Sequence, residues 1–280
     1  MTATTLTAEQ RGTGDYADVN GIRLYYETHG PADATRTLVL LHGGLGSGEM
    51  FAPVLPALSA GRRVILPDLQ GHGRTADIDR PLDVQLMAED IAALIEHLGL
   101  DKADVFGYSL GGGVAFFLAA RHPELIGKAV ILSANVRRDA IYPEMLAQQE
   151  QMGAAAADFL KGTPMYELYQ RVAPEPARFP RLLDKIGASM AGDFDHSDIV
   201  RSLNVPTLIA CGDADMAPPS HYVDVFKLLG GGLRDGGWMG ESRPKGGHAL
   251  AILPGLTHYN IGASPLFATV TLGFLERPAG

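Results

Sequence analysis

The sequence predicts an α/β fold: a mostly parallel sheet of eight strands, helices on both faces and one helical insertion. Short apolar, β-branched runs alternate along the chain with helical patterns, which is typical of parallel strands joined by right-handed crossovers. The alternation is interrupted only over residues 135–203. The hydrophobic fraction of 46% and charged fraction of 20% over 280 residues are those of an ordinary globular domain.

The eight expected strands differ in their patterns. The first two flank Asn20-Gly21, the strongest short hairpin signal, and should form two antiparallel edge strands. Residues 37–41 (TLVLL) form a continuous apolar run, as in a strand that is buried on both faces. The strands are expected at residues 16–19, 22–28, 37–41, 63–66, 103–106, 128–132, 207–210 and 250–253.

The helices are predicted from apolar spacing. Between residues 84 and 98 apolar residues recur every three or four positions, and Gly99 follows as a C-terminal cap. Residues 112–121 are almost entirely apolar and end before Pro123, so this helix must be buried. Further helices are expected at residues 51–58, 222–229 and 266–275.

Residues 135–203 are mainly helical in pattern and too long for a simple connection. We expect them to form a small helical cap over the carboxyl edge of the sheet. Residues 1–134 and 204–280 would then form the core domain. Residues 230–247 are rich in glycine and are expected to be a flexible surface loop.

Composition excludes several classes of function. A net charge of −9 without a basic run argues against nucleic-acid and anionic membrane partners. No apolar run reaches the roughly 18 residues of a membrane span, and residues 1–16 lack a signal-peptide pattern. The single cysteine, Cys211, fits a reducing compartment, so a cytoplasmic location is expected. Cys211 itself should be a small buried hydrophobe.

The strongest chemical signal is Gly107-Tyr108-Ser109-Leu110-Gly111, which matches G-x-S-x-G. It lies between an expected strand and an expected helix, the context in which the motif forms a strained turn that exposes the serine oxygen. Ser109 is therefore the candidate nucleophile. A serine hydroxyl needs a base, and that base needs an orienting acid.

Among nine histidines, His258 is the best candidate base. It follows the last expected strand and a Pro254-Gly255 turn, which places it on a loop at the carboxyl edge. His248 precedes that strand and would lie at the opposite edge. His221 is expected at a surface or capping position, and the scattered histidines show no metal-ligand spacing.

Two carboxylates, Asp213 and Asp215, follow the strand at residues 207–210. Asp215 lies farther into the loop and is the better partner for the imidazole N–H, whereas Asp213 is expected to shape the turn. The order along the chain is then Ser109, Asp215, His258, as in one of the known arrangements of this triad.

The chain resembles the α/β-hydrolase family from near Asp18 to Leu275. Four loops carry the resemblance: His42-Gly43-Gly44, the Asp68–Arg74 loop followed by Thr75, Gly212-Asp213-Ala214-Asp215 and Pro254-Gly255-Leu256-Thr257-His258. The resemblance implies that the backbone N–H groups of Gly44 and Leu110 form the oxyanion hole. Asp68 and His72 are expected to fix loop geometry.

Phe51 stands near the position where many relatives carry tryptophan. The residues expected to contact a substrate are Tyr108, Phe51, Met145, Tyr166 and Met216. The predicted function is a serine esterase that cleaves small-molecule carboxylic esters through an acyl-enzyme, without cofactor or metal. A lactonase, thioesterase or carbon–carbon bond hydrolase would use the same triad, and a receptor-like binding protein with slow turnover is the alternative outside these enzymes.

Overall fold

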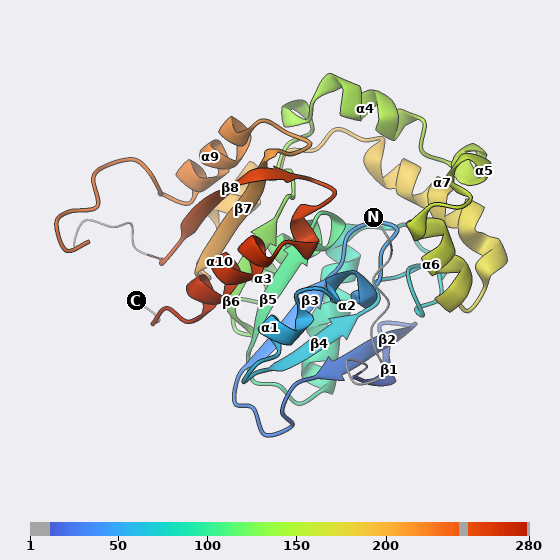
Figure 1. The fold of residues 1–280 in the computed structure, drawn as a ribbon, viewed down its shortest axis with the longest axis horizontal. Coiled ribbons are helices and arrows are strands. Elements are labelled where there is room, and N and C mark those ends of the chain that lie inside the picture. Colours follow the sequence, from blue (N-terminus) through green and yellow to red (C-terminus); the bar gives the residue numbers. More distant parts are fainter. Residues whose placement is uncertain (1–11, 241–245, 279–280) are drawn as a thin grey trace.

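The structure, a computed structural model, describes residues 12–240 and 246–278. One eight-stranded sheet runs through it in the order β1-β2-β4-β3-β5-β6-β7-β8 (Figure 1). The six strands from β4 to β8 in this order are parallel, so the expected α/β sheet is confirmed. The strands are β1 (Thr13–Val19), β2 (Ile22–His29), β3 (Thr37–Leu41), β4 (Arg63–Pro67), β5 (Ala103–Tyr108), β6 (Ile126–Leu132), β7 (Thr207–Ala214) and β8 (Ala249–Thr257).

The first two strands form the expected hairpin. Asn20 and Gly21 have φ of 46° and 79°, the positive values that a two-residue type I′ turn requires. Only β1 is an edge strand, however, because β2 also pairs with β4 in antiparallel fashion. The expectation of two edge strands here is therefore wrong, and β8 forms the opposite edge.

Helices cover both faces of the sheet. The alternation of side chains in β3 divides the core, because Leu38 and Leu40 join one buried cluster while Val39 and Leu41 join the other. The first cluster is covered by α1 (Leu55–Leu58) and α10 (Pro265–Leu275), the second by α2 (Val84–His97), α3 (Leu110–Arg121) and α9 (Pro219–Leu228).

The helix expected over residues 51–58 is wrong in extent. A 3-10 turn, η1 (Gly48–Phe51), precedes the single turn of α1. Pro53 lies between them and lacks the N–H that would continue the helical hydrogen bonds.

The segment between β6 and β7 is helical. It contains η2 (Arg138–Ala140), α4 (Pro143–Glu150), η3 (Ala154–Ala156), α5 (Ala157–Leu160), α6 (Pro164–Val172), η4 (Pro176–Arg178), α7 (Phe179–Met190) and α8 (Ser197–Arg201). Figure 1 shows α4, α5, α6 and α7 gathered outside the sheet. A single bridge between Arg137 and Asp195 joins the two ends of this group, whereas α8 contacts α3 and α9.

Polar contacts tie the helical segment to the loops beside it. Lys185 Nζ on α7 donates to Asp77 Oδ1 at 2.7 Å and to the carbonyls of Ile78 and Arg80 at 2.7 and 2.8 Å. On α6, both terminal nitrogens of Arg171 donate to Glu49, the shorter bond being 2.7 Å. Buried apolar side chains of α7, Phe179 among them, join the main core.

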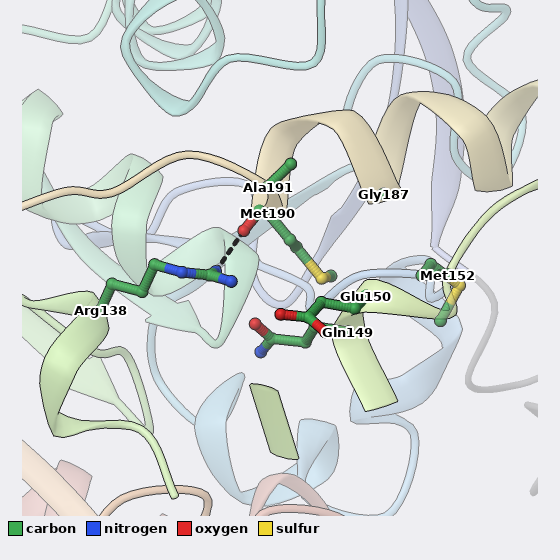
Figure 2. Close-up of a pocket in the computed structure, with 7 residues that line it drawn as sticks. All are labelled: Arg138, Gln149, Glu150, Met152, Gly187, Met190 and Ala191. Atoms are coloured by element: carbon green, nitrogen blue, oxygen red, sulfur yellow. Dashed lines mark hydrogen bonds between the residues drawn. The ribbon is translucent and has the colours of Figure 1, made fainter. Parts of the chain in front are cut away.

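A cavity of about 180 Å³ lies inside the helical segment (Figure 2). It is lined by Arg138, Gln149, Glu150, Met152, Gly187, Met190 and Ala191. Arg138 donates a hydrogen bond to the carbonyl of Met190, which joins η2 to the end of α7. None of the residues expected to contact substrate lines this cavity.

Three sequence expectations extend outside the described residues: the core domain of residues 1–134 and 204–280, the region considered for a signal peptide and the expected surface loop. Of residues 1–16, considered for a signal peptide, 1–11 lie outside them, as do residues 241–245 of the expected surface loop. Within residues 12–240 and 246–278, no helix has the length and apolar character needed to cross a bilayer, and no cluster of three potential metal ligands occurs. Cys211 is fully buried, as expected for a small hydrophobe.

Candidate active site

Ser109 occupies the turn between β5 and α3, where its φ is 54° and ψ is −115°. This positive φ is costly for a residue with a side chain and is typical of functional sites. Hydrogen bonds hold the turn: the Ser109 N–H donates to Leu132 O at 2.9 Å, and the Gly113 N–H donates to Ser109 O at 3.1 Å. The strained turn is therefore fixed at both ends.

The two outer glycines of the motif permit a close approach of the chain. A Cβ atom at Gly107 would lie 2.0 Å from the Gly111 carbonyl oxygen, and one at Gly111 would lie 2.3 Å from that of Leu41. No side chain fits in these spaces, because real Cβ atoms do not approach backbone atoms so closely. Strand β5, helix α3 and the end of β3 meet at these positions.

The side chain of His258 lies between Ser109 and Asp215. Its Nε2 is 3.1 Å from Ser109 Oγ, and its Nδ1 is 2.9 Å from Asp215 Oδ1. His258 directly follows β8 and is 7% exposed. The three side chains come from the carboxyl ends of β5, β7 and β8, where the sequence placed them.

Each oxygen of the Asp215 carboxylate accepts two hydrogen bonds. Oδ1 accepts from His258 Nδ1 and from the Met216 N–H at 2.8 Å, while Oδ2 accepts from Ser133 Oγ at 2.5 Å and the Gly212 N–H at 3.1 Å. Burial alone would raise the pKa of Asp215, but these donors and the His258 charge hold it below its usual range. The carboxylate is therefore ionised and oriented.

Asp213 has a different partner. Its Oδ1 accepts the Gly255 N–H at 2.8 Å, so it shapes a turn, although that turn belongs to the neighbouring strand. The turn expected at Pro254-Gly255 is instead a bulge inside β8. The pairing of β7 with β8 shifts between Gly212 and Ala214, and Gly255 has φ of 71°. The bulge carries the chain on to His258.

The segment expected to supply one oxyanion donor is held by His42. The His42 Nε2 accepts the Leu69 N–H at 3.0 Å, so the ring proton is on Nδ1, which donates to Gly43 O at 2.8 Å. Burial, together with the His72 ring, lowers the pKa of His42 to about 3. This neutral ring fixes the Gly43 carbonyl, and in a trans peptide the Gly44 N–H then points the opposite way.

Two backbone donors remain without a protein partner at this site. Among the hydrogen bonds of residues 12–240 and 246–278, none has the N–H of Gly44 or Leu110 as donor. Gly44 is exposed, and Leu110 is the first residue of α3 and half-buried. Both can therefore donate to a bound molecule.

Tyr108 contacts the catalytic candidates but presents little surface to a substrate. It is 7% exposed, its hydroxyl donates to the His258 carbonyl, and its ring centroid is 5.3 Å from that of His258. The sequence predicted a substrate contact, whereas in the structure this largely buried side chain packs against His258.

Phe51 is a clearer correction. It is fully buried and packs edge-to-face against Phe106, with ring centroids 5.4 Å apart. Phe51 presents no surface to a substrate, because it lies fully buried in the same core cluster as Phe106. Burial of this apolar ring in the core is favoured by the hydrophobic effect.

The other three expected contacts lie on the helical segment and the acid loop. Met145 is half-buried on α4, and Tyr166 on α6 packs edge-to-face against Phe179. Met216 is adjacent to Asp215, and its carbonyl accepts the Tyr142 N–H at 3.1 Å. The Met216 N–H also donates to Asp215, whereas Tyr166 contributes to packing within the helical segment.

Asp68 and His72 support loops, as expected. The Asp68 carboxylate accepts the Gly48 N–H at 2.9 Å and the Arg74 N–H at 2.8 Å, which ties the loop after β4 to η1. The His72 Nδ1 bonds to Gln70 O at 2.8 Å. Both side chains are buried.

Sequence reasoning was wrong on His221 and missed Ser133. His221 is buried, and its Nε2 accepts the Val136 N–H at 3.2 Å. Ser133 directly follows β6 and donates to Asp215. Like Asp215, Ser133 follows a parallel strand at the carboxyl edge of the sheet, and this position is the signal in the sequence that points to it.

Known proteins of one family are similar to this chain. A family model described as alpha/beta hydrolase fold matches residues 36–232, a span that includes Ser109 and Asp215. A pimeloyl-[acyl-carrier protein] methyl ester esterase from Neisseria meningitidis is 33% identical over 208 residues, covering 67% of this chain and 78% of that protein.

A putative carbamate hydrolase from Caulobacter is 31% identical over 218 residues, covering 70% of this chain and 80% of that protein. Among solved structures, a hydrolase from Pseudomonas aeruginosa superposes with a TM-score of 0.69 at 25% identity, covering 95% of this chain and 99% of that one.

Proposed function

The chain belongs to the α/β hydrolase fold family and is an ester-hydrolysing enzyme, and we propose that it cleaves small-molecule carboxylic esters. In this proposal Ser109 is the nucleophile, His258 is the base and Asp215 is the acid that orients the base. The observation that carries this proposal is the pair of hydrogen bonds at His258, 3.1 Å to Ser109 Oγ and 2.9 Å to Asp215 Oδ1. Such a relay lets the imidazole take the serine proton while the carboxylate fixes its tautomer.

In the first half of the reaction, Ser109 Oγ attacks the ester carbonyl and His258 Nε2 takes the hydroxyl proton. The carbonyl oxygen becomes an oxyanion, which the free N–H groups of Gly44 and Leu110 would stabilise. The start of α3 adds a favourable partial positive charge. Collapse of the tetrahedral intermediate breaks the C–O bond, and His258 returns the proton to the departing alcohol.

In the second half, water replaces the alcohol. His258 takes a proton from the water as its oxygen attacks the acyl carbon, and the same donors hold the second oxyanion. The intermediate collapses, His258 returns the proton to Ser109 Oγ, and the carboxylic acid leaves. The ionised Asp215 stabilises the imidazolium in both halves.

We assign residues 135–203 to a cap that selects the substrate, with Met145 and Tyr166 as its candidate contacts; Met216, beside Asp215, is a third candidate contact outside the cap. The narrow connection at Arg137 and Asp195 supports this division. Within residues 135–203, the last helix, α8, contacts α3 and α9 of the core domain. The single, buried cysteine fits action in the cytoplasm.

The test uses Ser109→Ala on p-nitrophenyl esters of graded acyl length. We expect the variant to keep its fold, measured by circular dichroism, and to lose at least about 10³-fold in kcat. A fluorophosphonate probe should label the parent at Ser109, as mapped by mass spectrometry. Full activity in the variant, or labelling at another residue, would overturn the proposal.

The substrate class is tested with the same preparation. Steady turnover of esters, faster than that of matched lactones and thioesters, is expected of an esterase. A single burst of product equal to the enzyme concentration, with no further turnover, would instead support a receptor-like protein that is acylated only once.

A further inference from the structure

We infer that Ser133 is a positioning residue for the acid of the triad, an inference that rests on the proposed role of Asp215. Its hydroxyl donates to Asp215 Oδ2 at 2.5 Å, on the carboxylate oxygen that does not face His258. It would fix the rotation of the carboxylate so that Oδ1 remains directed at His258 Nδ1.

The geometry of the four donors supports this role. The Met216 N–H is on the residue next to Asp215, and the Gly212 N–H lies three residues before it at the end of β7, so both donors belong to the chain segment that carries Asp215. The Ser133 hydroxyl comes from the adjacent strand β6 and contacts the carboxylate independently of that loop. Because rotation about the bond that carries a carboxylate has only broad minima, a donor fixed elsewhere in the sheet restricts it.

The position of Ser133 is itself rigid. Its N–H donates to Ala210 O at 2.8 Å, which extends the pairing of β6 with β7, and the residue is 2% exposed. A short O–H to carboxylate bond in this buried place is of the strong, charge-assisted kind. The position of the hydroxyl is therefore fixed by the pairing of the sheet.

The backbone of Ser133 is strained, with φ of 53°. Glycine would adopt this conformation without the steric cost that a Cβ atom brings. Serine at this position bears the steric strain and contributes one group that glycine lacks, the hydroxyl that donates to Asp215. Strain at a residue that touches the acid matches the tendency of strained residues to lie at functional sites.

The strain provides a matched pair of variants. Ser133→Ala removes the hydroxyl and keeps the strain, whereas Ser133→Gly removes the hydroxyl and relieves it. We expect both to lower kcat by roughly tenfold, with KM unchanged because Ser133 contacts Asp215 and not the substrate. The Gly variant should melt at a higher temperature than the Ala variant. A loss of kcat that follows melting temperature would overturn the inference.

The pH profile provides a second readout. With one donor fewer, the carboxylate attracts the His258 imidazolium more strongly, so the acid limb of kcat/KM should move to higher pH in both variants. A merely structural role would lower the activity without moving this limb. Profiles that superimpose on the parent's would therefore contradict the inference.

A double-mutant cycle separates this inference from the proposed function. Asp215→Asn alone should lower kcat by at least about 10³-fold, and adding Ser133→Ala to it should change kcat less than about twofold. If Asp215→Asn retains activity, the proposed function fails. If Asp215→Asn is inactive but Ser133→Ala equals the parent, only the role of Ser133 fails.

Discussion

The hydroxyl of Tyr108 donates a hydrogen bond to the backbone carbonyl of His258, 150 residues farther along the chain. Tyr108 directly precedes the candidate nucleophile, and a Cβ atom at Gly43 would lie 2.8 Å from its ring. One side chain thus lies against Gly43, the turn of Ser109 and the loop of His258. Burial raises the pKa of Tyr108, so its hydroxyl remains a donor across the working pH range.

Tyr108→Phe is expected to lower kcat by about fivefold, since it removes one neutral hydrogen bond worth about 1 kcal/mol from the loop that carries the base. Ester turnover at saturating substrate measures this effect. Tyr259→Phe is the control, because Tyr259 also lies beside the His258 ring but is 63% exposed. Equal kcat in Tyr108→Phe and the parent would show that this bond does not position the base.

Asp213, near the end of β7, and Asp215, directly after it, should differ sharply. Asp215→Asn leaves His258 Nδ1 facing an amide and is expected to reduce kcat at least about 10³-fold. Asp213→Asn keeps an oxygen that can accept the Gly255 N–H and should cost less than about fivefold. Turnover of one ester by both purified variants decides the assignment, which would be reversed if Asp213→Asn were the more damaged.

Stability should fall between pH 7 and pH 5. Burial is the main cause that lowers the pKa of His42 to about 3 and those of His72 and His221 to about 4, so the unfolded chain binds more protons in this range. The free energy of unfolding therefore decreases by up to about 1.4 kcal/mol per pH unit for each buried imidazole.

Urea unfolding at pH 7, 6 and 5 measures this dependence on pH. His221→Gln keeps an acceptor for the Val136 N–H. Near pH 5 it should reduce the number of protons taken up on unfolding by about one, and with it the slope of the unfolding free energy against pH. The exposed His97 provides the control, and His97→Gln should leave the slope unchanged. A parent protein whose stability is constant over this range would contradict the prediction.

Two glycine substitutions should have opposite effects on stability. Gly111→Ala would place a Cβ 2.3 Å from Leu41 O and 2.6 Å from His42 O, and we expect a loss of about 2–3 kcal/mol together with loss of activity. Gly273 lies inside α10 with no atom within 4 Å of the added Cβ, so Gly273→Ala should stabilise by about 0.5–1 kcal/mol. Urea midpoints measure both, and equal stability of the two variants would refute the packing argument.

The sequence alone determined the fold class and the three triad candidates. The apolar run at residues 37–41 predicted a strand buried on both faces, and the structure gives Thr37–Leu41 as β3, buried throughout. Ser109, Asp215 and His258 each follow a strand that the sequence located. Parallel strands bring their carboxyl ends to one edge, so local patterns were sufficient to place these residues close together.

Only the tertiary structure decided which side chains from distant segments of the chain contact one another. The packing of Phe51 depends on Phe106, the hydroxyl of Tyr108 reaches the His258 carbonyl, and Ser133 reaches Asp215. Periodicity and propensity describe a residue and its near neighbours along the chain. They carry no information on which side chains meet after the sheet has formed, because those contacts depend on packing across strands and layers.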